Sequence, residues 1–278
     1  MNTLSIQIHD DAAYAWPRER QILEQVLRIG FAGIDELAQR FDVTPQTIRR
    51  CVNRLCEQGL LRRVHGGVDS PSHGNLPYPR RQILNLDAKR RIANAVAAFI
   101  PDGASVSIGI GTTPAQVAVA LRAHTSLRVI TNSLNVATAL GGSPGIEVTI
   151  AGGPLRPSDL DVVGSGAVSC FSAFKTDFAV FGVGGIDRDG TLLDFEVAEV
   201  ATRLAMADNC RTSLLVADAS KFGRPAIARG GRLGDADHLF IDGPVPADYL
   251  GALQAGHPCV HLADRAETAA RQTGEACS

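Results

Sequence analysis

The feature that most constrains the fold is a regular alternation of short apolar runs with helical patterns, which begins near residue 86. Six runs have the length and composition of buried strands: Ser105–Ile110, Leu127–Ile130, Glu147–Ala151, Phe178–Val183, Ser213–Ala217 and His238–Ile241. Helical spacing of apolar residues appears at Asp87–Phe99, at Pro114–Arg122, in the stretch that ends at Leu140, and at Glu196–Asp208. This order predicts a mostly parallel sheet with helices on both faces.

Small polar residues follow the ends of these predicted strands. The carboxyl ends of parallel strands share one edge of the sheet, where open α/β sheets bind ligands. Gly111-Thr112-Thr113 and Thr131-Asn132-Ser133 each lead into a helix, so their N–H groups and hydroxyls could hold a phosphate. The alternative is that these residues serve only turns and helix caps. Several such loops at one edge favour a small phosphorylated ligand.

Four further residues at this edge have two interpretations each. Lys221 is one of only three lysines and follows a strand end, so it is either a phosphate-binding cation or an ordinary surface lysine. Asp187 and Gly190 form either a ligand contact or a plain turn. Glu196 begins a helix, so it either contacts the ligand or only interacts favourably with the helix dipole.

The first 70 residues have a different pattern, that of a winged helix-turn-helix. Two short helices, from Arg18 and over Ile34–Arg40, precede a third that begins at Thr44-Pro45, an N-cap followed by proline. Leu60–Val68 then has the pattern of a β-hairpin wing. The polar residues of the third helix and wing fit a major groove and its phosphates, and the expected DNA contacts are Thr44, Gln46, Thr47, Arg49, Arg50, Asn53, Arg54, Arg62, Arg63 and His65.

The distribution of charge agrees with a DNA-binding module. The whole chain carries a net charge of −2, which by itself argues against DNA. Residues 49–91, however, hold ten basic and three acidic residues, a local charge of +7, and the rest of the chain carries −9. This asymmetry is typical of a polyanion-binding module on an acidic body, although a basic linker would also produce it.

Proline, glycine and serine between residues 69 and 80 predict an inter-domain linker. The expected division is a flexible tail (1–16), the winged helix-turn-helix (17–68), a linker (69–85), an α/β domain (86–262) and a C-terminal tail (263–278). We find no membrane span, no secretory signal and no C-x-x-C pair, which predicts a cytoplasmic protein with reduced thiols. No dinucleotide fingerprint or metal-ligand spacing is present, so we expect no cofactor and no metal.

These motifs together resemble the DeoR family of bacterial transcription regulators. The resemblance is carried by Thr44–Arg50, Arg63–Gly67 and, further on, Ile110–Pro114, Val129–Ala137, Ala151–Arg156, Gly184–Gly190 and Asp218–Arg224. It implies an effector domain with the ribose-5-phosphate isomerase fold. The effector site it implies, together with the strand-end loops, comprises Gly111, Thr112, Thr113, Thr131, Asn132, Ser133, Gly152, Gly153, Asp187, Gly190, Glu196 and Lys221.

This sequence departs from the family pattern at a few positions. Cys51 and Val52 stand where the family usually has an acidic residue and leucine after the paired arginines. Gly109 and Ala219 replace positions that are often Asp and His, and Arg203 stands where Lys is frequent. The first departure concerns operator preference, and the others concern the identity of the effector.

The resemblance implies a repressor of sugar or polyol catabolism genes that binds double-stranded operator DNA as a homo-oligomer, a dimer or tetramer. A phosphorylated sugar or polyol, with glycerol 3-phosphate the expected one, would release it. Two alternatives are a sugar-phosphate isomerase-like enzyme and a DNA-binding protein with a degenerate sensor. Because a fused DNA-binding module is unusual for an enzyme, we expect no catalytic residue.

Overall fold

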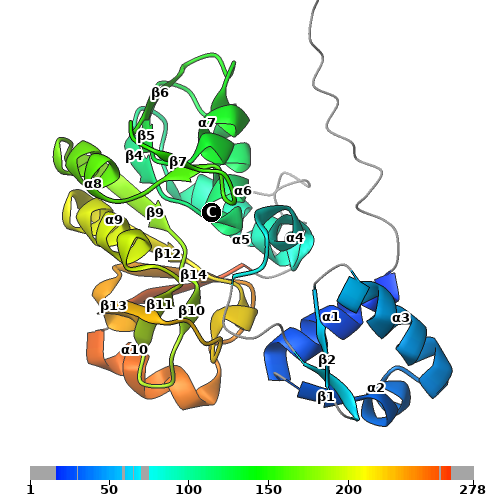
Figure 1. Cartoon of the computed structure of the whole chain (residues 1–278). Helices are drawn as coiled ribbons and strands as arrows, with labels where there is room; N and C mark the ends of the chain where they lie inside the picture. Colours follow the sequence, from blue (N-terminus) through cyan, green and yellow to red (C-terminus); the bar gives the residue numbers. More distant parts are fainter. Residues whose placement is uncertain are drawn as a thin grey trace, which may run out of the picture. The chain divides into compact units, whose positions relative to one another are not determined.

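The computed structural model describes residues 17–29, 31–57, 60–64, 66–69, 75–256 and 258–263 (Figure 1). The expected tail over 1–16 and nearly all of the C-terminal tail, 264–278, lie outside these residues. The chain forms two compact units, Met1–Ser72 and His73–Ser278. No helix of the described residues is long and apolar enough to cross a membrane.

The first unit contains three helices and a small antiparallel sheet. Its elements are α1 (Pro17–Ile29), β1 (Phe31–Gly33), α2 (Ile34–Arg40), α3 (Pro45–Glu57), β2 (Arg62–Val64) and β3 (Gly67–Asp69). Apolar residues at helical spacing on α1, α2 and α3 form the core, with Ile22, Leu37 and Ile48 almost fully buried. The unit is the winged helix-turn-helix that the sequence predicts.

Strand β1 belongs to the wing, although the sequence pattern predicts only a hairpin there. It pairs with β3, which also pairs with β2, so the hairpin becomes a three-stranded sheet in the order β1-β3-β2. The close approach of β1 explains Gly67: a Cβ built there would lie 2.3 Å from the carbonyl oxygen of Ala32. Gly66 has a φ of +78°, which glycine adopts without strain, and turns the hairpin.

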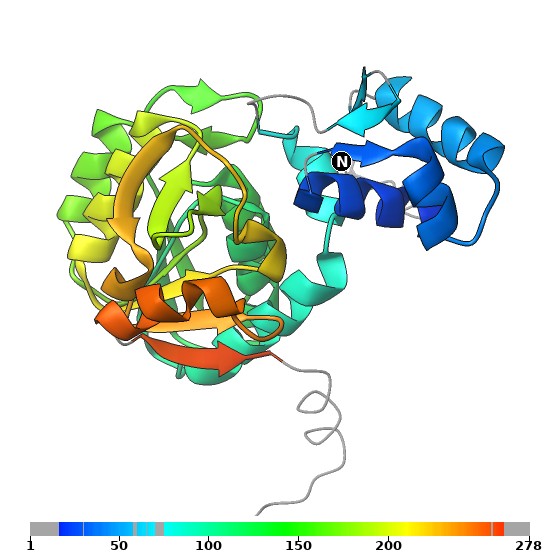
Figure 2. The ribbon, with the colours of Figure 1, turned by 90° about the horizontal axis from the view of Figure 1, so that it is seen from below.

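The second unit is built on a seven-stranded sheet whose neighbouring strands are all parallel. The order across the sheet is β15-β14-β12-β9-β4-β5-β6. The strands are β4 (Ser105–Ile108), β5 (Leu127–Thr131), β6 (Ile146–Ile150), β9 (Thr176–Phe181), β12 (Cys210–Val216), β14 (His238–Ile241) and β15 (Cys259–Leu262). Figure 2 shows β15 at one edge of the sheet.

Helices cover both faces of this sheet. One core joins the sheet to α5 (Leu86–Phe99), α6 (Thr112–Ala120) and α7 (Leu134–Leu140). The other joins it to α8 (Ser165–Ser172), α9 (Val197–Asp208) and α10 (Leu250–Gly256). Successive strand residues alternate between the two cores, since Leu214 lies in the first and Leu215 in the second. The three-layer α/β arrangement predicted from the alternation is therefore confirmed (Figure 1).

Small additions complete the unit and supply much of the site. They are α4 (Tyr78–Ile83), the pair β7 (Leu155–Arg156) and β8 (Asp161–Val162), the antiparallel sheet of β10 (Gly185–Ile186), β11 (Thr191–Asp194) and β13 (Ala228–Arg232), and the 3₁₀ turn η3 (Ala219–Lys221). These elements are too short to give a periodic pattern.

Two sequence predictions about element positions differ from the structure. The last strand of the sheet is β15, not His238–Ile241, because β15 has four residues that are mostly exposed and so lacks an apolar signal. Within the expected linker over 69–85, residues 78–83 form α4, whose Tyr78 is buried in the second unit. Its prolines indicated a linker, but Pro79 lies in the first turn of the helix, where proline is tolerated.

Candidate DNA-binding and effector sites

Helix α3 presents a polar face to solvent. Ile48, Cys51, Val52 and Leu55 form its buried stripe. The opposite side carries exposed polar residues at Gln46, Arg49, Arg50 and Asn53, with Thr47 half-buried in the first turn. In major grooves, arginine typically hydrogen-bonds guanine edges, and the amides of asparagine and glutamine hydrogen-bond adenine edges. This face carries two side chains of each kind.

Thr44 fixes the start of this helix. Its Oγ1 accepts a hydrogen bond from the backbone N–H of Thr47 at 3.3 Å, and the two threonine hydroxyls lie 3.0 Å apart. The hydroxyl of Thr44 thus serves the helix end in the structure, as the Thr-Pro pattern predicts.

Further predicted DNA contacts, Asn53 and three arginines, also have protein partners in the structure. The Nε of Arg54 lies 2.6 Å from a carboxylate oxygen of Glu19, a buried residue of α1, so Arg54 ties α3 to α1. Arg62 pairs with Asp69 across the hairpin at 3.1 Å. Arg63 donates to the side-chain oxygen of Asn53, which links the wing to α3. His65 lies outside the described residues.

In the second unit a cleft opens at the carboxyl ends of β4, β9 and β12. It encloses about 540 Å³, part of it open to solvent. Gly111, Thr112 and Thr113 line it at the start of α6, and Gly111 has a φ of +120° that glycine tolerates. The first N–H groups of a helix have no partner within the helix, which makes this end suitable for an anion.

Lys221 lies in the same cleft and is surrounded by other cations. Burial, together with the nearby charges of Arg224, Lys89 and Arg81, lowers the pKa of Lys221 to about 7, although Asp218 opposes the shift. Its Nζ makes no hydrogen bond or ion pair with any residue that the structure describes. An anion placed here would supply the missing negative charge.

Two arginines complete the cationic wall. Arg81 of α4 is largely buried, forms an ion pair with Asp159, and donates to the carbonyl of Leu76 at 2.8 Å. Burial lowers the pKa of Arg81 to about 10. Arg224 donates to the carbonyl of Gly184 at 3.1 Å, and its guanidinium lies 5.0 Å from the centre of the Phe195 ring. Both arginines are therefore held in fixed positions toward the cleft.

A network around Arg156 forms the acidic side of the site. Arg156 binds Asp161 through two hydrogen bonds of 2.7 and 2.9 Å, and reaches Glu196 and Glu199 at 2.8 Å each. Glu199 in turn accepts the backbone N–H groups of residues 195 and 196. The network joins β7, β8 and α9, and it neutralises carboxylates that would otherwise repel an anion.

A second cavity of about 320 Å³ adjoins the cleft and shares Ile110, Gly182, Asp194 and Glu199 with it. Phenylalanines and Met206 make much of its lining apolar. Asn132 lines it as well and is 1% exposed. Its side-chain N–H donates to the carbonyl of Val162, but its Oδ1 has no hydrogen-bond partner among the described residues. A buried carbonyl without a donor is costly, so this oxygen suits a ligand hydroxyl. Gly109 also lines this cavity, and a Cβ built there would approach Cε of Met206 to 3.1 Å, a tight contact.

The structure brings only some of the predicted effector residues together. Gly111, Thr112, Thr113 and Lys221 line the cleft, and Asn132 lines the second cavity. The remaining seven line neither cavity: Thr131, Ser133, Gly152, Gly153, Asp187, Gly190 and Glu196.

Those seven residues can be explained by local structure. Thr131 Oγ1 donates to the carbonyl of Ile108 at 2.7 Å, and Ser133 caps α7. Gly152 and Gly153 follow β6 at the surface. Asp187 and Gly190 form the turn between β10 and β11, so their turn interpretation fits the structure better than a ligand contact.

Glu196 precedes α9, is 56% exposed, and pairs with Arg156. It therefore contributes to the network and not to the lining of either cavity. Several residues that do line the cleft were not among the predicted site residues, namely Asn75, Arg81, Asp159, Asp161, Asp194, Phe195, Glu199 and Arg224. Arg224 falls in one of the family-like segments, but Arg81 lies in the expected linker. Arg81 could have been predicted as a site residue only if residues 78–83 had been recognised as a helix of the α/β domain.

Comparison with known proteins identifies the family of both units. Residues 18–73 match the family model of a DeoR-like helix-turn-helix domain, and residues 84–243 match that of the DeoR C terminal sensor domain. The chain is 42% identical over 241 residues to the glycerol-3-phosphate regulon repressor of Escherichia coli, covering 86% of this chain and 96% of that protein. It is 44% identical over 239 residues to the repressor of the same name from Haemophilus influenzae, covering 85% and 92%.

A third relative is the HTH-type transcriptional repressor CsqR of Escherichia coli, 41% identical over 239 residues, with 86% of this chain and 92% of that protein covered. Among solved structures, ribose 5-phosphate isomerase A from Methanocaldococcus jannaschii matches with a TM-score of 0.37 and 16% identity, over 50% of this chain and 55% of that one. This structural similarity is too low to support an argument about the site.

Proposed function

Because the chain belongs to the DeoR family of transcription regulators, we propose that it represses genes of polyol or sugar catabolism and leaves its operator when glycerol 3-phosphate binds. It is a DNA-binding regulator and not an enzyme, since its named relatives are transcriptional repressors with the same DNA-binding module. The operator and the choice among phosphorylated effectors are the proposed parts.

The observation that carries the effector proposal is the amino group of Lys221, which has no partner among the described residues and lies beside two arginines and the start of α6. Three cations close together repel one another unless an anion lies between them. A phosphate group would accept hydrogen bonds from Lys221 and from the N–H groups near Thr112 and Thr113. The acids of the cleft are already paired with Arg81, Arg156 and Arg203, so they oppose this anion less than their number suggests.

The second cavity supports a small polyol as the rest of the effector. The side-chain oxygen of Asn132 needs a donor, which a hydroxyl provides and a second phosphate does not. Glu199 is shared by the two cavities and could accept from another hydroxyl. A molecule with one phosphate and two hydroxyls on three carbons matches these groups.

For operator binding, we propose that Gln46, Thr47, Arg49, Arg50 and Asn53 of α3 meet base edges. Arg62 and Arg63 of the wing would contact phosphates after exchanging their present partners. Arg54 is better assigned to holding α3 on α1, because its ion pair with buried Glu19 would have to break before it reached DNA. We also propose a dimer or tetramer on a repeated operator, and a cytoplasmic location because chromosomal DNA is the partner.

Release by the effector requires a difference in affinity. Glycerol 3-phosphate can lower operator affinity only if it binds the DNA-incompetent arrangement more tightly than the competent one, and operator DNA must then weaken effector binding by the same factor. Typical coupling of this kind is about 1–3 kcal/mol, or roughly 5–150-fold.

The test uses operator DNA selected by the full chain from a random library. Its affinity is measured alone and with glycerol 3-phosphate, ribose 5-phosphate, glycerol or inorganic phosphate, and turnover of each compound is followed in parallel. We expect glycerol 3-phosphate alone to lower operator affinity at micromolar to low millimolar concentration, without turnover. Release by ribose 5-phosphate only would refute the proposed effector. No response to any compound would support a degenerate sensor, and turnover would support an enzyme.

A further inference from the structure

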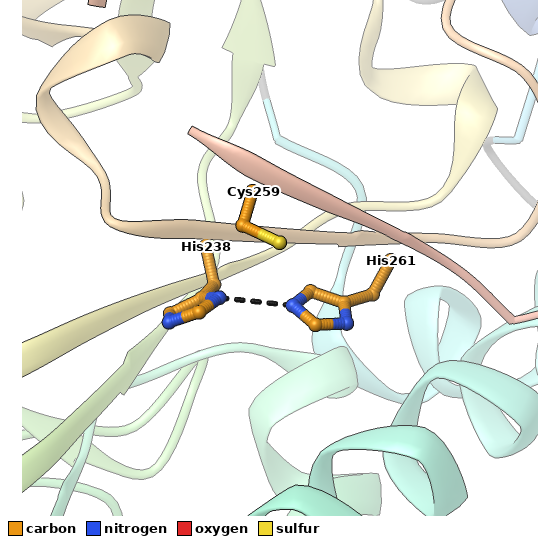
Figure 3. Close-up of side chains that lie close together, drawn as sticks. All are labelled: His238, Cys259 and His261. Carbon is orange, nitrogen blue, oxygen red and sulfur yellow. Dashed lines mark hydrogen bonds between the residues drawn. The ribbon is translucent and has the colours of Figure 1, made fainter. Parts of the chain in front are cut away.

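Two histidines and a cysteine meet near one edge of the large sheet, and none of them lines the effector cleft or its neighbouring cavity (Figure 3). His238 is the first residue of β14, and Cys259 and His261 belong to the edge strand β15. One ligand atom from each of the three lies within 4.8 Å of the other two. The Nδ1 of His238 and the Nε2 of His261 are 2.9 Å apart.

The parallel register of the two strands produces this cluster. His238 lies directly beside Cys259, and Phe240 beside His261. Because side chains alternate between faces along a strand, residues 259 and 261 point to the same side of the sheet, as do 238 and 240. The three ligand residues therefore share one face, although 20 residues separate His238 from Cys259 in the chain.

Aromatic neighbours hold the two imidazole rings. The ring of His261 stacks on Phe240 with centroids 4.3 Å apart and an angle of 7° between the planes. Phe99 of α5 packs against both histidines, with centroid distances of 4.7 Å to His238 and 5.5 Å to His261. Rings that are already oriented lose little freedom when they bind an ion.

We propose that His238, Cys259 and His261 form a binding site for a divalent transition metal, with Zn²⁺ as the best match. Imidazole nitrogen and thiolate sulfur are the ligands that zinc prefers, at bond lengths of about 2.0–2.1 and 2.3 Å. Tetrahedral binding requires the two nitrogens to be about 3.3 Å apart. The imidazoles need to separate by only about 0.4 Å from their hydrogen-bonded distance. The ion then replaces the proton that the two rings share.

An ion can reach the three side chains from solvent, and a fourth ligand position stays open. Cys259 is exposed, and the two histidines are half-buried. Asp237, the acidic residue next to His238, is already engaged, since its carboxylate accepts the N–H and hydroxyl of Ser213 at 2.7 and 2.8 Å. Water would fill the fourth position.

The bound ion would fasten β15 to β14. The edge strand has only four residues, and three of them are exposed. The site lies toward the amino ends of these strands, whereas the effector cleft lies at the carboxyl ends of β4, β9 and β12. Metal binding is therefore expected to be independent of the proposed effector.

The test is titration of the full, metal-free, reduced chain with Zn²⁺, followed by calorimetry, and with Co²⁺, followed by absorption. We expect one ion per chain and a thiolate-to-cobalt charge-transfer band. Cys259→Ser and His238→Gln should each lower Zn²⁺ affinity at least about tenfold, and Cys259→Ser should abolish the band. Cys170→Ser, which alters a half-buried cysteine on α8, is the matched control and should behave as wild type.

Two results would overturn the proposal: no zinc binding by the wild-type chain, or unchanged affinity and an unchanged cobalt spectrum in Cys259→Ser. Because Cys259 is exposed, its replacement by serine should leave the fold intact, which circular dichroism and operator binding can verify. The melting temperature gives a second readout. Zn²⁺ should raise it in the wild type and in Cys170→Ser but not in Cys259→Ser.

Discussion

The affinity for the effector should fall steeply as the pH rises above 7, because the side-chain amino group of Lys221 is only partly protonated in the free protein. Burial and the neighbouring cations Arg224, Lys89 and Arg81 lower its pKa to about 7. A bound phosphate dianion favours the charged form and raises this pKa toward its ordinary value near 10.4. The protein must therefore take up a proton when the effector binds at neutral or higher pH.

The size of the effect follows from the fraction of Lys221 that is protonated before binding. With a pKa of about 7, roughly half of the chains carry the charge at pH 7, about a tenth at pH 8 and about a hundredth at pH 9. The apparent dissociation constant for glycerol 3-phosphate should thus rise almost tenfold per pH unit above about 7.5. Below pH 6 the affinity should fall again, because the phosphate itself gains a proton.

The assay is isothermal titration calorimetry between pH 6 and pH 9, in pairs of buffers that differ in ionisation enthalpy. The protein should take up about half a proton per bound effector molecule at pH 7 and close to one proton at pH 8. Lys221→Met should weaken binding and remove the uptake, and Lys175→Met, at an exposed lysine, should change neither. An affinity that stays constant from pH 7 to 9, or uptake that persists in Lys221→Met, would refute the reasoning.

Three further substitutions test other parts of the structure. Arg50→Ala should weaken operator binding by about 1–3 kcal/mol in a mobility-shift assay; an unchanged affinity would show that Arg50 does not read bases. Arg156→Met should destabilise the second unit by about 3–5 kcal/mol in urea unfolding, because it leaves carboxylates of its network buried without a counter-charge; a loss below 1 kcal/mol would contradict this. Gly67→Ala should abolish operator binding through the clash with β1, whereas Gly251→Ala, which has open space, should not.

The sequence and the structure agree best where a long periodic pattern or a cap defines an element. Helix α2 has the predicted bounds, and α3 begins after the predicted cap at Thr44. The order of strands and helices also predicted the layered α/β unit, since a parallel crossover usually contains a helix between two buried strands. These features depend on neighbours within a few residues, so a single sequence contains them.

Agreement is weaker for the effector site, where the same residue types serve two purposes. Thr131 and Ser133 have the composition of a phosphate loop, but the structure uses their hydroxyls to fix β5 and α7. Asp187 and Gly190 similarly form a hairpin turn. Turn and ligand functions select the same small polar side chains, so local sequence cannot separate them.

What the sequence by itself determined about this protein is the pair of modules, helix α3 with its polar face, and the edge of the sheet at which small polar loops gather, where we propose that an effector binds with Lys221 as its cation. Only the tertiary structure decided that Arg81 and Arg224 join Lys221, that Arg54 is held by Glu19, and that histidines 238 and 261 meet Cys259. The physical reason is range: helices and strands follow from contacts between residues close in the chain, whereas these clusters arise from register and packing between segments that are distant in sequence.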